Sequence, residues 1–134
     1  MTSKVIYQGS LRTICEHLQS GQQMITDAPT DNNGKGEAFS PTDLLATSLA
    51  ACMITVMGIK ANANAWNIDD TELQVTKIMA SDPRRVSEII IELNMPKDRE
   101  FDDKTRKILE NTARTCPVAL SLHPDIKQNI IFNW

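Results

Sequence analysis

The sequence predicts an α+β domain in which antiparallel sheets pack around a long central helix. Short segments with alternating apolar and polar residues, typical of strands, lie before and after one long apolar segment with helical spacing. No internal repeat or low-complexity segment interrupts the 134 residues, and this length fits a single domain, 1–134, with its own core. The predicted order of elements is βββ-α-ββ-α-α-β.

The N-terminal region predicts a three-stranded meander. Residues 4–8 and 11–18 have the composition of strands, with Gly9 and Ser10 as the turn between them. A second turn then leads into a short third strand at 23–28. Residues 27–38 are rich in Asp, Asn, Gly and Pro, so we expect a loop there.

The start of the long helix is marked by three residues. Ser40 suits the N-cap, Pro41 suits the first helical position, and Asp43 stands where a capping box has its acidic member. We expect this helix to run to about Ala65. It is apolar around nearly its whole circumference, which indicates a place at the centre of the molecule or in a subunit interface. Its apolar run, 44–59, is shorter than the ~20 residues that a membrane span needs, which favours a buried core helix.

The C-terminal half predicts two longer strands, two short helices and a final strand. In the second of these longer strands, Ile89, Ile91 and Leu93 alternate with other residues, as expected for a strand with one buried face. The predicted elements are strands at 71–81 and 86–96 joined across 82–85, helices at 101–115 and from Pro117, and a strand at 125–134.

Composition and charge exclude several classes of function. The formal net charge is −3 and the sequence pI is about 5.3, so neither nucleic acid nor a membrane surface is an expected partner. The N-terminus does not have the composition of a secretory signal. Three cysteines without a CxxC motif or a Cys/His cluster predict a reducing, cytoplasmic location, with no structural disulfide, no metal and no other cofactor.

The cysteines are nevertheless the candidate reactive groups. Cys52 lies about three turns into the long helix, beyond the reach of the helix dipole, and its position favours packing over chemistry. Cys116 precedes a helix start, where unsatisfied N–H groups favour a thiolate. Cys15 is expected to be a packed strand residue. His17 and His123 cannot be assigned to a Cys-His pair from their spacing.

Cys52 and Cys116 are 64 residues apart, so only tertiary folding could bring them within disulfide range. A low-pKa, accessible thiol next to a buried one is typical of a redox pair. Arg12, Glu16 and Glu37 are expected to be exposed charges, and the alternative is that they face a site.

Two segments together resemble the signature of a known superfamily. "SPTDLLATSLAACM" (40–53) and "ARTCPVALSL" (113–122) resemble the two-cysteine signature of the OsmC/Ohr superfamily, the osmotically inducible protein C and organic hydroperoxide resistance proteins. The predicted order of elements also matches along nearly the whole chain. The phrases "GKGEAFSP" and "TCPVALSLHPDI" are more similar to the OsmC-like branch than to the Ohr branch.

This resemblance implies an intertwined homodimer with its sites at the subunit interface. It also implies a peroxidase of oxidative stress defence that acts on organic hydroperoxides and is reset by an external dithiol. Cys52 would then be the peroxidatic thiolate, Cys116 the resolving thiol, and Arg12 the match for the arginine that supports the thiolate. Peroxidase members carry an acid directly after the Pro of the helix start; this chain has Thr42 there, followed by Asp43.

Two alternatives to the peroxidase stay open. The same dimer could bind a small apolar or thiol-reactive ligand, or sense redox changes, without turnover. Alternatively, the cysteines could be packing residues in a scaffold. Alkylation of the native protein separates these cases, because a scaffold would have no cysteine that reacts faster than a free thiol peptide at neutral pH.

Overall fold

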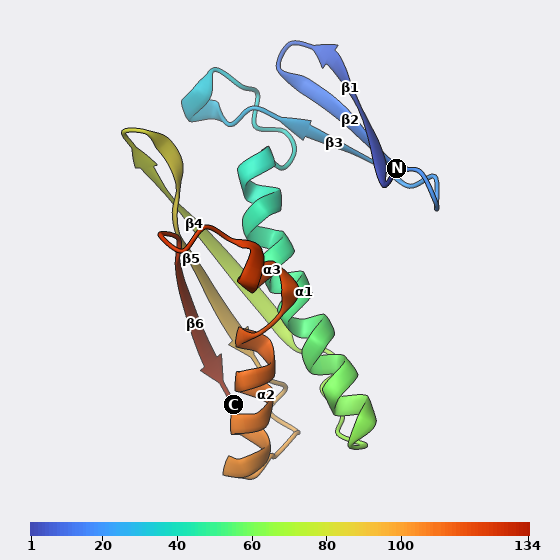
Figure 1. Cartoon of the computed structure of the whole chain (residues 1–134), viewed down its shortest axis with the longest axis vertical. Coiled ribbons are helices and arrows are strands. Elements are labelled where there is room, and N and C mark those ends of the chain that lie inside the picture. Colours follow the sequence, from blue (N-terminus) through green and yellow to red (C-terminus); the bar gives the residue numbers. More distant parts are fainter. The chain divides into compact units, whose positions relative to one another are not determined.

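The computed structural model describes residues 1–134 and confirms the α+β class and the predicted order of elements (Figure 1). The chain forms two compact units, Met1–Leu45 and Ala46–Trp134. The strands are β1 (Ser3–Gly9), β2 (Arg12–His17), β3 (Gln23–Asp27), β4 (Glu72–Ser81), β5 (Arg84–Asn94) and β6 (Lys127–Asn133); the helices are α1 (Pro41–Ala63), α2 (Asp103–Arg114) and α3 (Pro117–Ser121), with a 3₁₀ turn at Thr30–Asn32.

The unit Met1–Leu45 contains the predicted meander, an antiparallel sheet in the order β1-β2-β3. Its first turn lies at Ser10 and Leu11, one residue later than predicted, because Gly9 pairs with Arg12. Both turn residues have positive φ, 52° and 61°. A two-residue hairpin turn of this kind requires positive φ at both central positions, so the turn geometry sets the end of β1.

This N-terminal sheet has no apolar core within its own unit. The buried residues of Met1–Leu45 are Thr26, Asp27 and Ser40, all of them polar. Large apolar side chains are instead exposed, with Val5 at 61% and Tyr7 at 64%. A three-stranded sheet gains its stability from an apolar face packed on another element, so this sheet depends on polar pairing and on further contacts of its apolar side chains.

The capping box at the start of α1 is confirmed. The backbone N–H of Asp43 donates to Ser40 Oγ at 3.1 Å, and the Ser40 N–H donates to Asp43 Oδ2 at 2.8 Å. The helix ends at Ala63, two residues before the predicted end, and Ala65 has a left-handed φ of 54°. Reciprocal bonds of this type satisfy two backbone donors and fix the first turn.

The long helix is longer than its apolar run. With 23 residues and a mean hydropathy of 1.8 in its most apolar window, α1 could cross a membrane by length and composition. The prediction that the segment is too short for a span is therefore wrong, because polar residues at both ends extend the helix. The core helix of a soluble protein meets the same criteria, and six α1 side chains are buried.

The unit Ala46–Trp134 contains a sheet in the order β4-β5-β6. β4 and β5 are antiparallel as predicted, with Ser81 paired to Arg84 across a two-residue turn that is shorter than the predicted 82–85 connection. β6 is parallel to β5, so the prediction of antiparallel pairing is wrong for this strand. The reason is the connection: α2 and α3 carry the chain back between β5 and β6, and such crossovers join parallel strands.

The core of this unit lies between one face of the sheet and its helices. Ile89, Ile91 and Leu93 of β5 alternate as predicted and are at most 1% exposed. A bulge in the β4–β5 pairing shifts the register by one residue, so Val86, three positions before Ile89, is also buried. The helices pack on this face (Figure 1) and bury the following residues with it. They are Ala46, Leu49, Ala50, Met53, Met57, Ala61, Leu109, Ala113, Cys116 and Ala119.

Replacing Leu109 by Ala tests this core. Leu109 is fully buried in α2. Because the truncation leaves a cavity, we expect Leu109→Ala to lower the free energy of unfolding by about 2–5 kcal/mol in urea titrations. Lys107→Ala, at an exposed position of the same helix, is the control and should change it by less than ~0.5 kcal/mol. Equal losses in the two variants would contradict the described packing.

Candidate functional site

The structure brings Cys52 of α1 together with Cys116 at the start of α3. Cys52 packs against the core cluster that contains Cys116 and is close enough to raise the pKa of the Cys116 thiol, and both residues are free thiols. Cys116 is 0% exposed, whereas Cys52 is partly exposed. The tertiary approach of these two distant residues, on which a redox pair depends, is therefore present.

The break between α2 and α3 positions Cys116. Pro117 stands at the start of α3, where its missing N–H leaves no unsatisfied donor. Cys116 is the N-cap as predicted, and its Sγ accepts a hydrogen bond from the Ala119 N–H at 3.3 Å. Ala113 and Ala119, on the two sides of this break, are buried in the core. The short helix therefore holds the thiol in place while the core removes it from water.

Burial raises the pKa of the Cys116 thiol above its usual value, against the hydrogen bond from Ala119, which lowers it; contact with Cys52 raises it further. The prediction that this helix start favours a thiolate is wrong. The helix has only five residues, and the backbone N–H groups of Ala119 and Val118, which lower the pKa of this thiol, do not offset the effect of burial. Cys116 is therefore the buried, protonated thiol of the pair, and Cys52 is the accessible one.

Arg12 lies in β2 and is held by two carboxylates of its own unit. Its Nε and Nη2 donate to Asp27 Oδ1 and Oδ2, both at 2.7 Å, and Nη2 also donates to Glu37 Oε2 at 2.7 Å. The two-bond contact with Asp27 fixes the plane of the guanidinium. These bonds raise the pKa of Arg12 and hold the pKa of Asp27 below its ordinary value.

The loop after β3 brings Glu37 to this cluster. The Glu37 N–H donates to Asp27 Oδ2 at 3.1 Å, and the Asp27 N–H donates to the Phe39 carbonyl at 3.1 Å. Gly34 makes the return path possible, because a Cβ at this position would lie 1.6 Å from the carbonyl oxygen of Ala28. The loop therefore closes over the end of β3 and places a second acid on Arg12.

Sequence reasoning missed Asp27 and treated Glu37 as an exposed charge. A signal was available, because Arg12 and Asp27 are directly paired across β2 and β3, and opposite charges favour such pairs. The chain has Thr42 where peroxidase relatives have an acid, and its Arg12 takes acids from β3 and the following loop instead. The role of Arg12 beside Cys52 stays a prediction.

The third cysteine lines a cavity rather than a packed interior. Cys15, His17 and Met24 border a space of about 350 Å³ within the N-terminal unit. His17 is thus close to a cysteine in the fold, on the same strand. His123 lies elsewhere and is exposed, 3.7 Å from Asp125.

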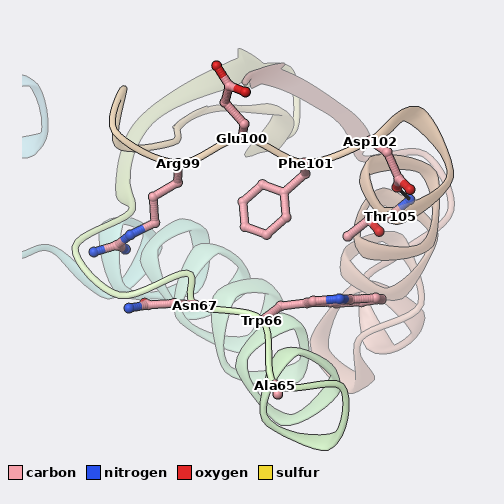
Figure 2. A pocket seen from close by; sticks show the side chains of 8 residues that line it. All are labelled: Ala65, Trp66, Asn67, Arg99, Glu100, Phe101, Asp102 and Thr105. Atoms are coloured by element: carbon pink, nitrogen blue, oxygen red, sulfur yellow. Dashed lines mark hydrogen bonds between the residues drawn. The ribbon is translucent and has the colours of Figure 1, made fainter.

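A second cavity, of about 410 Å³, lies between the end of α1 and the start of α2 and contains no cysteine. Figure 2 shows the phenyl ring of Phe101 between Arg99 and Trp66, while the carboxylate of Glu100 points away. The Arg99 guanidinium donates to the Asp69 carbonyl and lies 3.7 Å from Asp70. The Arg99 guanidinium therefore links the segment before α2 to the segment that follows α1. No cluster of three or more His, Cys, Asp or Glu residues has a metal-binding arrangement.

The α+β fold, together with a partly exposed thiol beside a buried one, is typical of proteins with a pair of cysteines at one site. A family model described as OsmC-like protein matches residues 34–130, so this chain belongs to the OsmC-like family. This confirms the family resemblance of the two cysteine segments. Among proteins with curated descriptions, none matches the chain.

Solved structures agree with this assignment. A protein of Psychrobacter arcticus 273-4, described as a candidate osmotic stress induced and detoxification response protein, is 62% identical, with a TM-score of 0.95 over 99% of this chain and 96% of that chain. Organic hydroperoxide resistance proteins share the fold at low identity. The Legionella pneumophila protein is 15% identical (TM-score 0.77, covering 100% and 98%), and the Vibrio cholerae protein, with captopril in one active site, is 13% identical (TM-score 0.74, covering 99% and 92%).

The pairing of Arg12 with Asp27 predicts a pH-dependent contribution to stability. Because the folded pKa of Asp27 is lowered, this contribution is complete above the unfolded pKa of ~3.9 and is lost as pH falls through the folded pKa. We expect Asp27→Asn to be less stable than the wild type in urea at neutral pH, with a difference that shrinks below about pH 4. Asp98→Asn, at an exposed position, is the control and should show no such trend. A difference that stays constant on acidification would contradict the lowered pKa.

Proposed function

We propose that this protein is a thiol-dependent peroxidase that reduces organic hydroperoxides, with Cys52 as the peroxidatic and Cys116 as the resolving thiol. The observation that carries the proposal is the contact between a partly exposed Cys52 and a fully buried Cys116. Membership of the OsmC-like family supports it, as does the fold shared with proteins named for organic hydroperoxide resistance. We further propose a role in oxidative stress defence in the cytoplasm, where thiols stay reduced.

The first step uses the accessible thiol. The Cys52 thiolate attacks the hydroperoxide oxygen that carries hydrogen, so an S–O bond forms as the O–O bond breaks. The released alkoxide takes up a proton and leaves as an alcohol, and Cys52 becomes a sulfenic acid. Cys116 is shielded from the substrate because its side chain has no exposed surface.

The second step uses the contact between the two side chains. The Cys116 sulfur attacks the Cys52 sulfenic acid, the S–O bond breaks, and the hydroxyl leaves as water with the proton of Cys116. A disulfide results, and no further oxidant is needed. The raised pKa of Cys116 keeps it protonated in the reduced enzyme, which limits its oxidation before Cys52 has reacted.

An external dithiol completes the cycle. One of its thiolates attacks the disulfide, the second displaces the mixed disulfide, and both cysteines return to thiols. The sum is one hydroperoxide and one dithiol converted to an alcohol, water and one cyclic or protein disulfide. No metal or organic cofactor takes part in this scheme.

We assign Arg12 as the group that supports the Cys52 thiolate. Its guanidinium is fixed in one plane by Asp27 and oriented further by Glu37. In peroxidase relatives the acid after the helix-start Pro has this orienting role. The acids on Arg12 support the proposal that the function of that acid has moved to a different part of this chain.

We also propose that the protein is a homodimer with intertwined chains. The N-terminal sheet buries only polar residues in its own unit and exposes Val5 and Tyr7. Large apolar side chains exposed on a small sheet without an apolar core are typical of a surface that another chain covers. The family resemblance supplies the same arrangement.

Variants of the cysteines separate the two proposed roles. Cys52→Ser should abolish the consumption of tert-butyl hydroperoxide with a dithiol, because no nucleophile remains. Cys116→Ser should still consume one hydroperoxide per chain and accumulate a sulfenic acid, detected with dimedone by mass spectrometry, but should form no intramolecular disulfide. Cys15→Ser is the matched control and should keep the wild-type turnover.

Two results would count against the peroxidase. One is a wild-type protein that consumes no hydroperoxide with any dithiol although Cys52 is alkylated faster than a free thiol peptide. That result would favour the binding or sensing alternative. The other is turnover that survives Cys52→Ser, which would assign the chemistry to another group.

The dimer predicts a solution mass of twice the 14.9 kDa of one chain by light scattering. Val5→Lys should weaken the dimer and shift the mass toward one chain on dilution, because a buried lysine is costly in an interface. Asp98→Lys, at an exposed loop position, changes charge by a larger amount and should leave the mass unchanged. A wild-type mass of one chain at micromolar concentration would overturn the dimer.

A further inference from the structure

Three potential metal ligands share one face of the N-terminal sheet. Cys15 in β2 is paired directly with Met24 in β3, so both side chains leave the sheet on the same side. Residues in this relation have Cβ atoms about 4.5–5.5 Å apart. His17 follows Cys15 by two positions on β2, which places it on that face as well. All three line the cavity of about 350 Å³.

Neighbouring hydroxyl groups hold two of these side chains, His17 and Cys15, in orientations suited to metal binding. Ser20 Oγ lies 2.7 Å from His17 Nδ1. A partner on one ring nitrogen fixes the imidazole and leaves Nε2 as the ligating atom. Thr13 Oγ1 lies 3.7 Å from Cys15 Sγ, where its hydroxyl can donate to the sulfur. Each ligand except the flexible thioether of Met24 therefore has a second group that orients it.

The donor set selects the kind of ion. It consists of a thiol, a thioether and an imidazole, and the lining of the cavity contains no carboxylate. Ca²⁺ and Mg²⁺ require oxygen ligands, and structural zinc requires four ligands of the Cys and His type. Soft sulfur ligands together with imidazole suit Cu(I). Leu44 adds an apolar wall to the cavity.

We propose that Cys15, His17 and Met24 bind one Cu(I) ion per chain. On binding, a Cu–S bond replaces the S–H bond of Cys15 and one proton is released, while Met24 Sδ and His17 Nε2 donate lone pairs. The oxidation state of the metal does not change, so no reductant or oxidant is consumed. The site uses neither Cys52 nor Cys116 and does not rest on the proposed peroxidase. Val5 is paired with Cys15 and shares this face of the sheet, so in the proposed dimer the ion lies at the subunit interface.

The test uses the full chain with Cys52→Ser and Cys116→Ser, which removes the other thiols as competing ligands. Anaerobic titration with Cu(I) in competition with bicinchoninate should show one ion per chain and the release of about one proton. Adding Cys15→Ser should abolish this binding. Adding Met24→Leu, which conserves volume, should weaken it at least tenfold, whereas Met79→Leu on β4 is the matched control and should leave it unchanged.

X-ray absorption of the loaded protein should show two sulfur ligands and one nitrogen ligand. Circular dichroism of each variant should match that of the parent, which shows that lost binding is not lost folding. The proposal is overturned if the parent does not compete with the chelator, or if binding survives Cys15→Ser. It is also overturned if Met24→Leu and Met79→Leu bind alike.

Discussion

Burial of one face of α1 is the constraint on which the C-terminal unit depends. Leu49, Met53 and Met57, four residues apart in sequence, are at most 1% exposed and pack with β5. Because each residue turns an α-helix by roughly 100°, fixing this face fixes the direction of every other α1 side chain. Cys52, next to Met53, therefore lies beside the buried face, where it contacts Cys116 and keeps part of its surface. The core therefore sets which of the two thiols is accessible.

Local patterns predicted most of the fold. The capping box from Ser40 to Asp43 and the alternation along β5 depend on neighbours within a few residues, and the structure confirms both. The parallel pairing of β6 with β5 was not predicted. The alternation in β6 specifies a strand with two unlike faces, but not the direction of its partner. That direction depends on the end of the sheet to which α2 and α3 return the chain, and this is set by tertiary packing.

The candidate site was predicted less completely than the fold. The pairing of Cys52 with Cys116 was weighed from the residues, and their spacing left it open; the roles of the two thiols came from the family resemblance. The protonation of Cys116 was predicted wrongly, because a helix start is visible in the sequence whereas burial is not. Asp27 was missed, although the meander could have placed it opposite Arg12. Opposite charges at paired positions of adjacent strands would thus have predicted the partner of Arg12 from the sequence.

One strand register connects the two proposed sites of this chain. A buried ion pair adds little net stability, because desolvation offsets the attraction, but it penalises arrangements that separate the charges. A slip of one residue between β2 and β3 would turn Asp27, which is 1% exposed, away from Arg12 and leave it unpaired. The Arg12–Asp27 pair therefore selects the register in a sheet without an apolar core. The same register places Cys15 opposite Met24, so the acid that holds the proposed thiolate partner also assembles the proposed metal ligands.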